Sequence, residues 1–342
     1  MLLLTAGLGL LAATVSPAVA ASGDSPSEGH RDFASVDRPG PPLEVPADEL
    51  ARSLRCGSDL ATGTRAPVLL VPGTTLTPEV NFSWNYARAF DAANRPHCTI
   101  TLPNHAMSDI QVAGEHLVYA IRTMHRASGR KIEVVGFSQG GMVGRWALRF
   151  WPDTRAMVDD LVGLDPSNHG TLDSYAVCVT GCAPAFFQQG TGSRFLEALN
   201  SVQETFAGIS YTQIYTITDE VVAPNLGPKA SSALRTGDGQ IANVAVQRIC
   251  PVHVAEHLTM GTVDPVGYAL VRDALTHVGP ADPGRIDRGV CAKALMPGVD
   301  PVTFPTNFAN VTVTAAEQVA TYPHVPREPP LKPYVFAQSL GR

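Results

Sequence analysis

The sequence predicts an α/β fold with a mostly parallel central sheet and helices on both faces. From about residue 56, short apolar runs alternate with longer amphipathic stretches, and no internal repeat is visible. Strands that alternate with helices along a chain indicate a parallel sheet covered on both sides. The expected strands are residues 68–71, 99–102, 132–135, 161–164, 214–217 and 244–249. The expected helices include residues 112–126, 142–150 and 266–277.

Composition and charge limit the class of protein. The chain has 342 residues, 44% of them hydrophobic and 16% charged, as in an ordinary globular protein. Chains of this length can form two domains, but α/β folds of this size often form one. The net charge of −6, without a basic cluster, argues against nucleic acid as a partner. We therefore expect a single domain over residues 51–342, with the Pro-rich tail from about residue 300 wrapping its surface.

The N-terminal residues predict export. Residues 1–20 are apolar, uncharged and end in Ala18-Val19-Ala20, a pattern that suits cleavage by a signal peptidase. We interpret them as a signal peptide, which predicts a secreted, extracellular protein. An uncleaved anchor is the alternative, because the run is nearly long enough to span a bilayer. Residues 21–50 are rich in Gly, Pro, Ser and Asp and lack apolar periodicity, so we expect a flexible leader.

The cysteines support the same compartment. An even number in an exported chain indicates disulfides, although six cysteines permit fifteen connectivities. The pair Cys178 and Cys182 has no second Cys or His pair at zinc-like spacing, so we expect no metal site. The six cysteines are Cys56, Cys98, Cys178, Cys182, Cys250 and Cys291.

A candidate nucleophile lies in the stretch Gly136-Phe137-Ser138-Gln139-Gly140. A lone G-x-S-x-G motif is weak evidence, but this one follows an expected strand and precedes an expected helix. A serine on such a turn exposes its Oγ, and the first N–H groups of the helix face a developing oxyanion. The motif therefore predicts a serine hydrolase of the α/β-hydrolase fold, with Ser138 as the nucleophile.

The serine needs a base, and the base needs a third group that fixes its tautomer. In α/β-hydrolases the acid and then the histidine follow the nucleophile along the chain. His257, in a loop between the last expected strand and a helix, is the expected base, and His253 in the same loop is its competitor. Asp219 and Asp165 each follow an expected strand, so both are candidates for the acid.

The oxyanion hole needs two donors. The backbone N–H of Gln139, the residue after the nucleophile, should be one of them. Thr74, in the loop after the first expected strand, offers its backbone N–H and its hydroxyl. This chemistry requires no metal or cofactor. Candidates for lining the substrate cleft are the apolar residues Phe137, Phe186, Phe187, Val221 and Val222.

These stretches resemble the Candida antarctica lipase B-like lipases and their bacterial relatives. The shared segments are LLVPGT (69–74), SQGG (138–141) after an aromatic residue, TDEVV (218–222) and the loop of His257. The similarity extends from about Cys56 to the region of Cys291 and weakens in the tail. It implies an α/β-hydrolase fold, the triad Ser138, Asp219 and His257, and an oxyanion hole formed by Thr74 and Gln139.

The resemblance also implies two disulfides, Cys56–Cys98 and Cys250–Cys291. The separation of 42 residues in the first pair agrees with the spacing in that family. Cys178 and Cys182 have no counterpart there and should close a small loop over the acyl pocket.

Three features depart from the family. Phe137 replaces a tryptophan, so the alcohol side of the pocket should have a different shape. Ser167 replaces an aspartate close to the oxyanion loop. The C-terminal helix that lines one wall of the acyl pocket in the family is not recognisable in the tail, so chain-length preference does not carry over.

We thus expect a secreted, monomeric serine lipase or carboxylesterase that hydrolyses acyl glycerols or similar lipid esters, acting at a lipid–water interface. An amidase or polyester hydrolase with the same triad is the alternative among enzymes. A non-catalytic relative that binds a lipid or a polymer in the same cleft is the alternative outside them.

Overall fold

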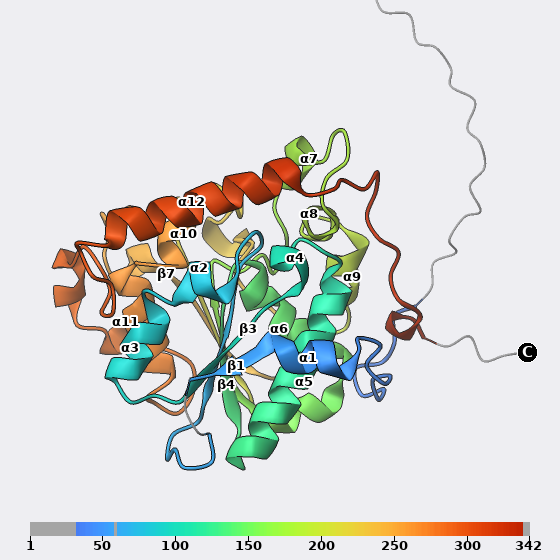
Figure 1. Ribbon diagram of the computed structural model, residues 1–342, viewed down its shortest axis with the longest axis horizontal. Coiled ribbons are helices and arrows are strands. Elements are labelled where there is room, and N and C mark those ends of the chain that lie inside the picture. Colours follow the sequence, from blue (N-terminus) through green and yellow to red (C-terminus); the bar gives the residue numbers. More distant parts are fainter. Residues whose placement is uncertain (1–31, 58–59, 338–342) are drawn as a thin grey trace, which may run out of the picture. The chain divides into compact units, whose positions relative to one another are not determined.

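A seven-stranded sheet forms the centre of the computed structural model, which describes residues 32–57 and 60–337 (Figure 1). The strand order is β1-β3-β2-β4-β5-β6-β7, and all neighbours are parallel except β1 and β3. The strands are β1 (Leu54–Cys56), β2 (Val68–Val71), β3 (His97–Ile100), β4 (Ile132–Phe137), β5 (Val158–Leu164), β6 (Ser210–Tyr215) and β7 (Gln240–Ala245). The prediction of an α/β fold with a mostly parallel sheet is confirmed.

The structure differs from the strand predictions in several places. The strands expected at residues 99–102 and 214–217 correspond to β3 and β6, which both begin and end earlier in the chain. The edge strand β1 was not expected, because three residues are too few for a visible alternation. The last strand was expected at residues 244–249, but β7 ends at Ala245 and a 3₁₀ turn follows over Val246–Arg248. Val246 and Ile249 are apolar because they are buried in the core beside the sheet rather than paired within it.

Alternate residues of the central strands face opposite sides of the sheet, as the pleat requires. Leu69 and Val71 of β2 pack with one helical layer, and Val68 and Leu70 pack with the other. The first layer contains α1 (Ala47–Ser53), α4 (Pro103–Ala106), α5 (Ile110–Ser128), α6 (Gln139–Phe150), α8 (Pro184–Gln188) and α9 (Arg194–Leu199). The second contains α2 (Pro78–Phe82), α3 (Tyr86–Ala92), α10 (His257–Met260), α11 (Pro265–Ala274) and α12 (Phe304–Thr321).

The expected leader differs from the structure over residues 33–50. This segment packs on α5 and α6: Trp151 Nε1 donates to the carbonyl of Pro41 at 2.8 Å, and Glu115 Oε2 accepts the N–H of Val45 at 2.9 Å. The compact unit accordingly begins at Phe33. Composition misleads here because Gly and Pro prevent regular structure, whereas buried side chains of the domain satisfy the backbone groups of the segment. The expected signal peptide and residues 21–31 lie outside the described residues.

The tail differs as well, because it contains the 18-residue helix α12 (Figure 1). Its contacts with the rest of the molecule come from Phe304, Phe308, Val311 and Ala315, which are spaced as one helical face. The sequence analysis missed this helix for two reasons. Val311 is its one buried residue, so the sequence carries no strong apolar stripe, and its Val and Thr residues have low helix propensity. In the described residues, no helix is long and apolar enough to cross a membrane.

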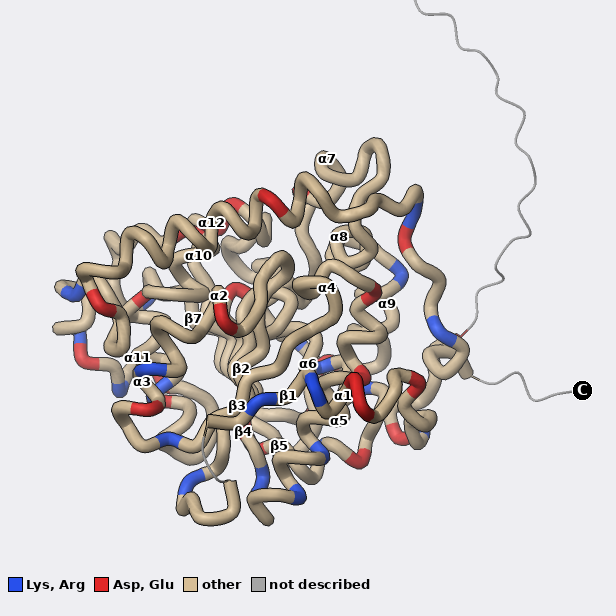
Figure 2. The backbone as a smooth tube through the Cα atoms, viewed as in Figure 1, with Lys and Arg blue, Asp and Glu red and all other residues tan. Residues whose placement is uncertain are grey.

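Three disulfides are present, and each pairing expected from the sequence is confirmed. Cys56–Cys98 joins β1 to its neighbour β3, and Cys250–Cys291 ties the segment after β7 to the chain beyond α11. Cys178–Cys182 closes a loop directly after α7 (Asp173–Val177). In the part of the chain that the structure describes, Lys and Arg are interspersed with Asp and Glu (Figure 2).

Candidate active site

The residues singled out in the sequence converge at one edge of the sheet. The carboxyl ends of parallel strands meet at this edge, where α/β proteins bind their ligands. The residues that follow the strands here are Thr74 after β2, Ser138 after β4, Asp165 after β5, Asp219 after β6 and His257 after β7.

Ser138 occupies the sharp turn between β4 and α6. Its φ of 53° and ψ of −122° are unusual for a residue with a side chain, and its N–H donates to the carbonyl of Leu164 at 2.8 Å. The turn is possible because Gly140 has no side chain: a Cβ atom there would lie 2.2 Å from the carbonyl oxygen of Val71. This is the local geometry that the G-x-S-x-G spacing predicts.

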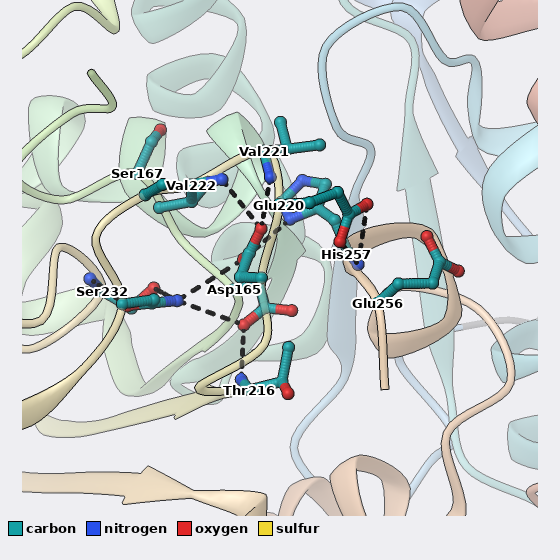
Figure 3. Close-up of polar contacts among 12 residues, drawn as sticks. Asp165, Ser167, Thr216, Glu220, Val221, Val222, Ser232, Glu256 and His257 are labelled. Carbon is teal, nitrogen blue, oxygen red and sulfur yellow. Dashed lines mark hydrogen bonds and ion pairs between the residues drawn. The ribbon is translucent and has the colours of Figure 1, made fainter. Parts of the chain in front are cut away.

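His257 is oriented by Asp219. The Nδ1 atom of His257 lies 3.0 Å from Oδ2 of Asp219, and both side chains are buried. The other oxygen, Oδ1 of Asp219, accepts the backbone N–H groups of Val221 (2.9 Å) and Val222 (2.8 Å) (Figure 3). A local turn therefore occupies one carboxylate oxygen and leaves the other for the imidazole.

The backbone at His257 is fixed by neighbouring glutamates. Its N–H donates to Glu220 at 3.2 Å (Figure 3), and Glu256 caps α10 by accepting the N–H groups of Leu258 and Thr259. Burial, together with the charge of Glu220, raises the pKa of Glu256 above its ordinary value.

The competing candidates have other partners. His253 pairs with Asp264, and this hydrogen bond raises the pKa of the His253 imidazole. Asp165 accepts the backbone N–H of Thr216 at 2.8 Å and is fully buried behind Asp219. The structure thus pairs His257 with Asp219 and pairs His253 with Asp264 instead.

Thr74 and Gln139 are hydrogen-bonded to each other. The Nε2 group of Gln139 donates to Oγ1 of Thr74 at 3.0 Å, and Nε2 of Gln189 donates to the same oxygen at 2.9 Å. Since both lone pairs of Oγ1 are then occupied, the hydroxyl proton of Thr74 is free to donate to a third group. The backbone N–H of Gln139 belongs to the first turn of α6, where N–H groups have no partner within the helix.

Gln189 was not recognised from the sequence. Its Oε1 accepts the hydroxyl of Ser167 at 2.9 Å, so its NH₂ group is directed toward Thr74. The Ser167 position was noted as a departure from the family, but its partner Gln189, the residue directly after α8, could not be identified without the fold.

A pocket of about 330 Å³ opens above Ser138 and His257. Four of the five apolar residues expected in the cleft line it, whereas Phe187 lines a separate surface hollow beside α7. The ring of Phe137 also packs on His257, with centroids 4.7 Å apart. The lining residues include Thr74, Phe137, Ser138, Phe186, Gln189, Val221, Val222, His257, Ala315 and Val319.

One wall of the pocket was missed by the sequence analysis. Ala315 and Val319 of α12 line the pocket, as does Val177 of α7. Ala315 and Val319 continue the helical spacing of Phe304, Phe308 and Val311. The apolar helical pattern is therefore present in the sequence, but most of its positions are only partly buried.

Asp165, Asp219 and His257 form a group with a geometry that could hold a metal ion, because their nitrogen and oxygen atoms lie within 4.8 Å of one another. The hydrogen bonds of Asp219 already account for both of its oxygens, and the sequence offers no zinc-like ligand spacing. We derive no metal chemistry from this group.

Comparisons with known proteins identify the family of the chain. The family described as Lipase (class 2) matches residues 67–250. Lipase B of Pseudozyma antarctica is 31% identical over 315 residues, which cover 88% of each chain.

Solved structures share the fold of this chain. The crystal structure of Aspergillus fumigatus lipase B superposes with a TM-score of 0.80 at 29% identity, covering 91% of this chain and 77% of that one. The propeptide form of Bacillus licheniformis lipase BlEst2 matches with a TM-score of 0.50 at 16% identity, which reflects the fold alone.

Proposed function

Because the chain belongs to the class 2 lipase family of α/β-hydrolases, we propose that it is a serine lipase or carboxylesterase that hydrolyses acyl glycerols or similar lipid esters. The observation that carries the proposal is the pairing of His257 with the buried Asp219, 3.0 Å apart, in the pocket that also exposes Ser138. A carboxylate-held histidine and a serine on a strained turn, both lining one pocket, are the groups from which an activated hydroxyl nucleophile is built.

In the proposed reaction, Ser138 Oγ attacks the ester carbonyl while His257 accepts its proton. The new C–O bond gives a tetrahedral oxyanion, and its collapse breaks the bond to the alcohol, which leaves with the proton from His257. Asp219 stabilises the imidazolium that forms in between. Water then attacks the acyl-serine by the same sequence of proton transfers and releases the acid.

The oxyanion is stabilised by preorganised donors. These are the backbone N–H groups of Thr74 and Gln139 and the hydroxyl of Thr74, whose oxygen is held by the two glutamine amides. Donors that are fixed before the reaction need no reorganisation when the charge develops.

The surface around the pocket supports a lipid ester as the substrate. Residues 171–193 contain one charged residue, Asp173, and α12 also contains one, Glu317. Large apolar side chains are exposed on these two walls, including Tyr175 (61% exposed), Val179 (79%) and Val313 (63%). An apolar rim with few charges can bind the surface of an aggregated lipid, so we propose that the enzyme acts at a lipid–water interface.

We further propose that the protein is exported and acts as a monomer. The apolar residues 1–20 and the three disulfides support export to an oxidising compartment. All proposed catalytic groups come from a single chain, so one copy is sufficient for the reaction.

A substrate profile tests the proposal. Hydrolysis rates should be measured on p-nitrophenyl esters of graded acyl length, on an emulsified triglyceride and on matched anilides. We expect turnover of the esters and of the emulsion, with much slower cleavage of the anilides. Faster cleavage of anilides would indicate an amidase, and binding of the emulsion without turnover of any substrate would indicate a non-catalytic relative.

A further inference from the structure

Asp165 is the carboxyl group that the proposed reaction leaves unused. It follows β5, has a φ of 41° and is fully buried. Its Oδ1 accepts the N–H of Thr216 at 2.8 Å and faces the side-chain amide of Asn225 at 3.5 Å (Figure 3). Its Oδ2 is buried and receives no hydrogen bond from any N–H or O–H group in the described part of the chain.

The neighbour of this carboxyl is another acid. One carboxylate oxygen of Asp165, one of Asp219 and one ring nitrogen of His257 lie within 4.8 Å of one another, and the amide of Asn225 faces both carboxyls, at 3.5 Å from each. No Lys or Arg side chain takes part in these contacts. Two buried carboxylates this close, without a cation between them, cannot both be ionised at low cost.

The contacts indicate which of the two is neutral. Asp219 accepts two backbone N–H groups on one oxygen and faces Nδ1 of His257 with the other, so its environment stabilises a carboxylate. Asp165 has a donor for one oxygen and none for the other, as expected of a carboxylic acid whose second oxygen carries the proton. Burial, and then the charge of Asp219, raise the pKa of Asp165 well above its ordinary range.

We propose that Asp165 is a neutral carboxylic acid that shares its Oδ2 proton with Asp219 and so acts as a positioning residue behind the triad. The proposal rests on the proposed function, in which Asp219 orients His257. The hydrogen bond fixes the carboxylate of Asp219 and reduces its affinity for a proton. Asp219 then remains ionised when the imidazolium forms beside it.

The other charged groups around this pair do not replace this interaction. Asp264, which also raises the pKa of Asp165, is paired with His253. Glu220 and Glu256 accept backbone N–H groups at the start of α10. His257 is therefore the group left to respond to the charge of the pair. A second negative charge, or loss of the hydrogen bond to Asp219, should therefore move the acidic limb of the pH profile of activity to higher pH.

Two substitutions at Asp165 distinguish loss of its hydrogen-bond donor from loss of its ability to ionise. Asp165→Asn keeps a donor and cannot ionise, so we expect kcat/KM within about threefold of the wild type and an unchanged acidic limb of the pH profile. Asp165→Ala removes the donor, so kcat should fall about tenfold, as for one lost hydrogen bond, and the acidic limb should move to higher pH. Asp160→Asn, a buried acid at the other end of β5, is the matched control and should leave the limb in place.

A direct measurement accompanies the kinetics. The infrared difference spectrum between the wild type and Asp165→Asn near neutral pH should contain the band of one neutral carboxyl, because the carboxyls common to both proteins cancel. Absence of this difference would show that Asp165 is ionised and would overturn the proposal, even if Asp165→Ala failed to fold.

Two kinetic outcomes would also overturn it. An unmoved acidic limb in a folded Asp165→Ala variant would leave Asp165 without a positioning role. A fall of about 10⁴ in Asp165→Asn would instead make Asp165 the ionised acid of the triad. Labelling of Ser138 by a fluorophosphonate does not depend on these results. A failure of the hydrolase proposal would therefore be recognised separately.

Discussion

The molecule buries two pairs of carboxyl groups at opposite ends of the same sheet, and they differ in what lies beside them. Asp165 and Asp219 follow the carboxyl ends of β5 and β6 and face His257. Glu133 and Asp160 are register partners near the amino ends of β4 and β5, and Glu133 forms an ion pair with Arg95.

Burial raises the pKa of carboxyl groups at both ends of the sheet. It raises the pKa of Glu133 to about 7 and that of Asp160 to about 8, although Arg95 opposes the shift of Glu133. It also raises the pKa of Asp165. The difference is that a titrating imidazole lies beside one pair and a permanently charged guanidinium beside the other. The first pair should therefore control the pH dependence of activity, and the second should control the pH dependence of stability.

The largest effect at the carboxyl end should come from Ser138→Ala. Without the hydroxyl no acyl-enzyme forms, and in a serine protease the corresponding loss was on the order of 10⁶ in kcat. The melting temperature should change little, since one hydroxyl is removed at the base of the pocket. Assays on a short-chain ester with purified variant and wild type measure both quantities. Near-wild-type rates in a folded variant would contradict the assignment of the nucleophile.

Asp219→Asn should have the next largest effect. The amide presents the wrong tautomer of His257 to Ser138, and the corresponding change in a serine protease lowered kcat by about 10⁴. The comparison with Asp165→Asn is the informative one, because the two side chains are neighbours. If Asp165→Asn proved the more damaging of the two, the roles assigned to the two acids would be reversed.

Gln189→Leu should have an effect of about tenfold on kcat. Thr74 Oγ1 would lose one of its two donors, so its hydroxyl proton would no longer be directed to one position. A single neutral hydrogen bond contributes about 1 kcal/mol, which corresponds to slightly less than a factor of ten in rate.

Gln188→Leu is the matched control for that variant. Gln188 precedes Gln189 in the chain, is also buried, and bonds Asp109 and the N–H of Ile110 away from the pocket. Its loss should lower the melting temperature and leave kcat unchanged. Equal kinetic effects of the two substitutions would show that Gln189 acts through the stability of α8 and not through Thr74.

The smallest effect on activity should come from Asp160→Asn, at the amino end. The folded protein holds the Asp160 proton up to about pH 8, whereas the ordinary pKa is 3.8. The unfolded chain therefore releases this proton first, and the stability of the wild type should fall as the pH rises from about 4 to about 8. Asparagine cannot ionise, so this part of the fall should disappear.

Melting curves across this pH range measure the difference. The variant should gain stability over the wild type above about pH 8, while kcat/KM near neutral pH stays the same. A parallel pH dependence in the two proteins would show that Asp160 is ionised in the folded wild type.

Much of the fold was predictable, because the central strands are short buried runs separated by regular helices. The strand at residues 68–71 and the turn at Ser138 were located by local patterns, since the glycines of the motif are required by contacts as close as 2.2 Å. The edge strand β1 and the packed segment 33–50 were not predictable, because tertiary contacts rather than local periodicity hold them in place.

The site residues were predictable where the order of the residues along the chain and their positions after strands identify them. The sequence left both Asp165 and Asp219 as candidates for the acid, because each follows a strand. What distinguishes them is orientation: the turn at Val221 and Val222 directs Asp219 to His257, and the N–H of Thr216 holds Asp165 behind it. Gln189, directly after α8, and Val319 of α12 reach the site through helix packing that single-sequence patterns do not contain.

The central claim is that Ser138 is an activated nucleophile. Incubation of the native protein with a fluorophosphonate, followed by mass spectrometry of its peptides, tests it directly, because an ordinary serine does not react. We predict a single covalent adduct on Ser138, formed in parallel with the loss of ester hydrolysis and strongly slowed in Asp219→Asn. Continued ester hydrolysis without an adduct, or an adduct on a different residue, would contradict the claim.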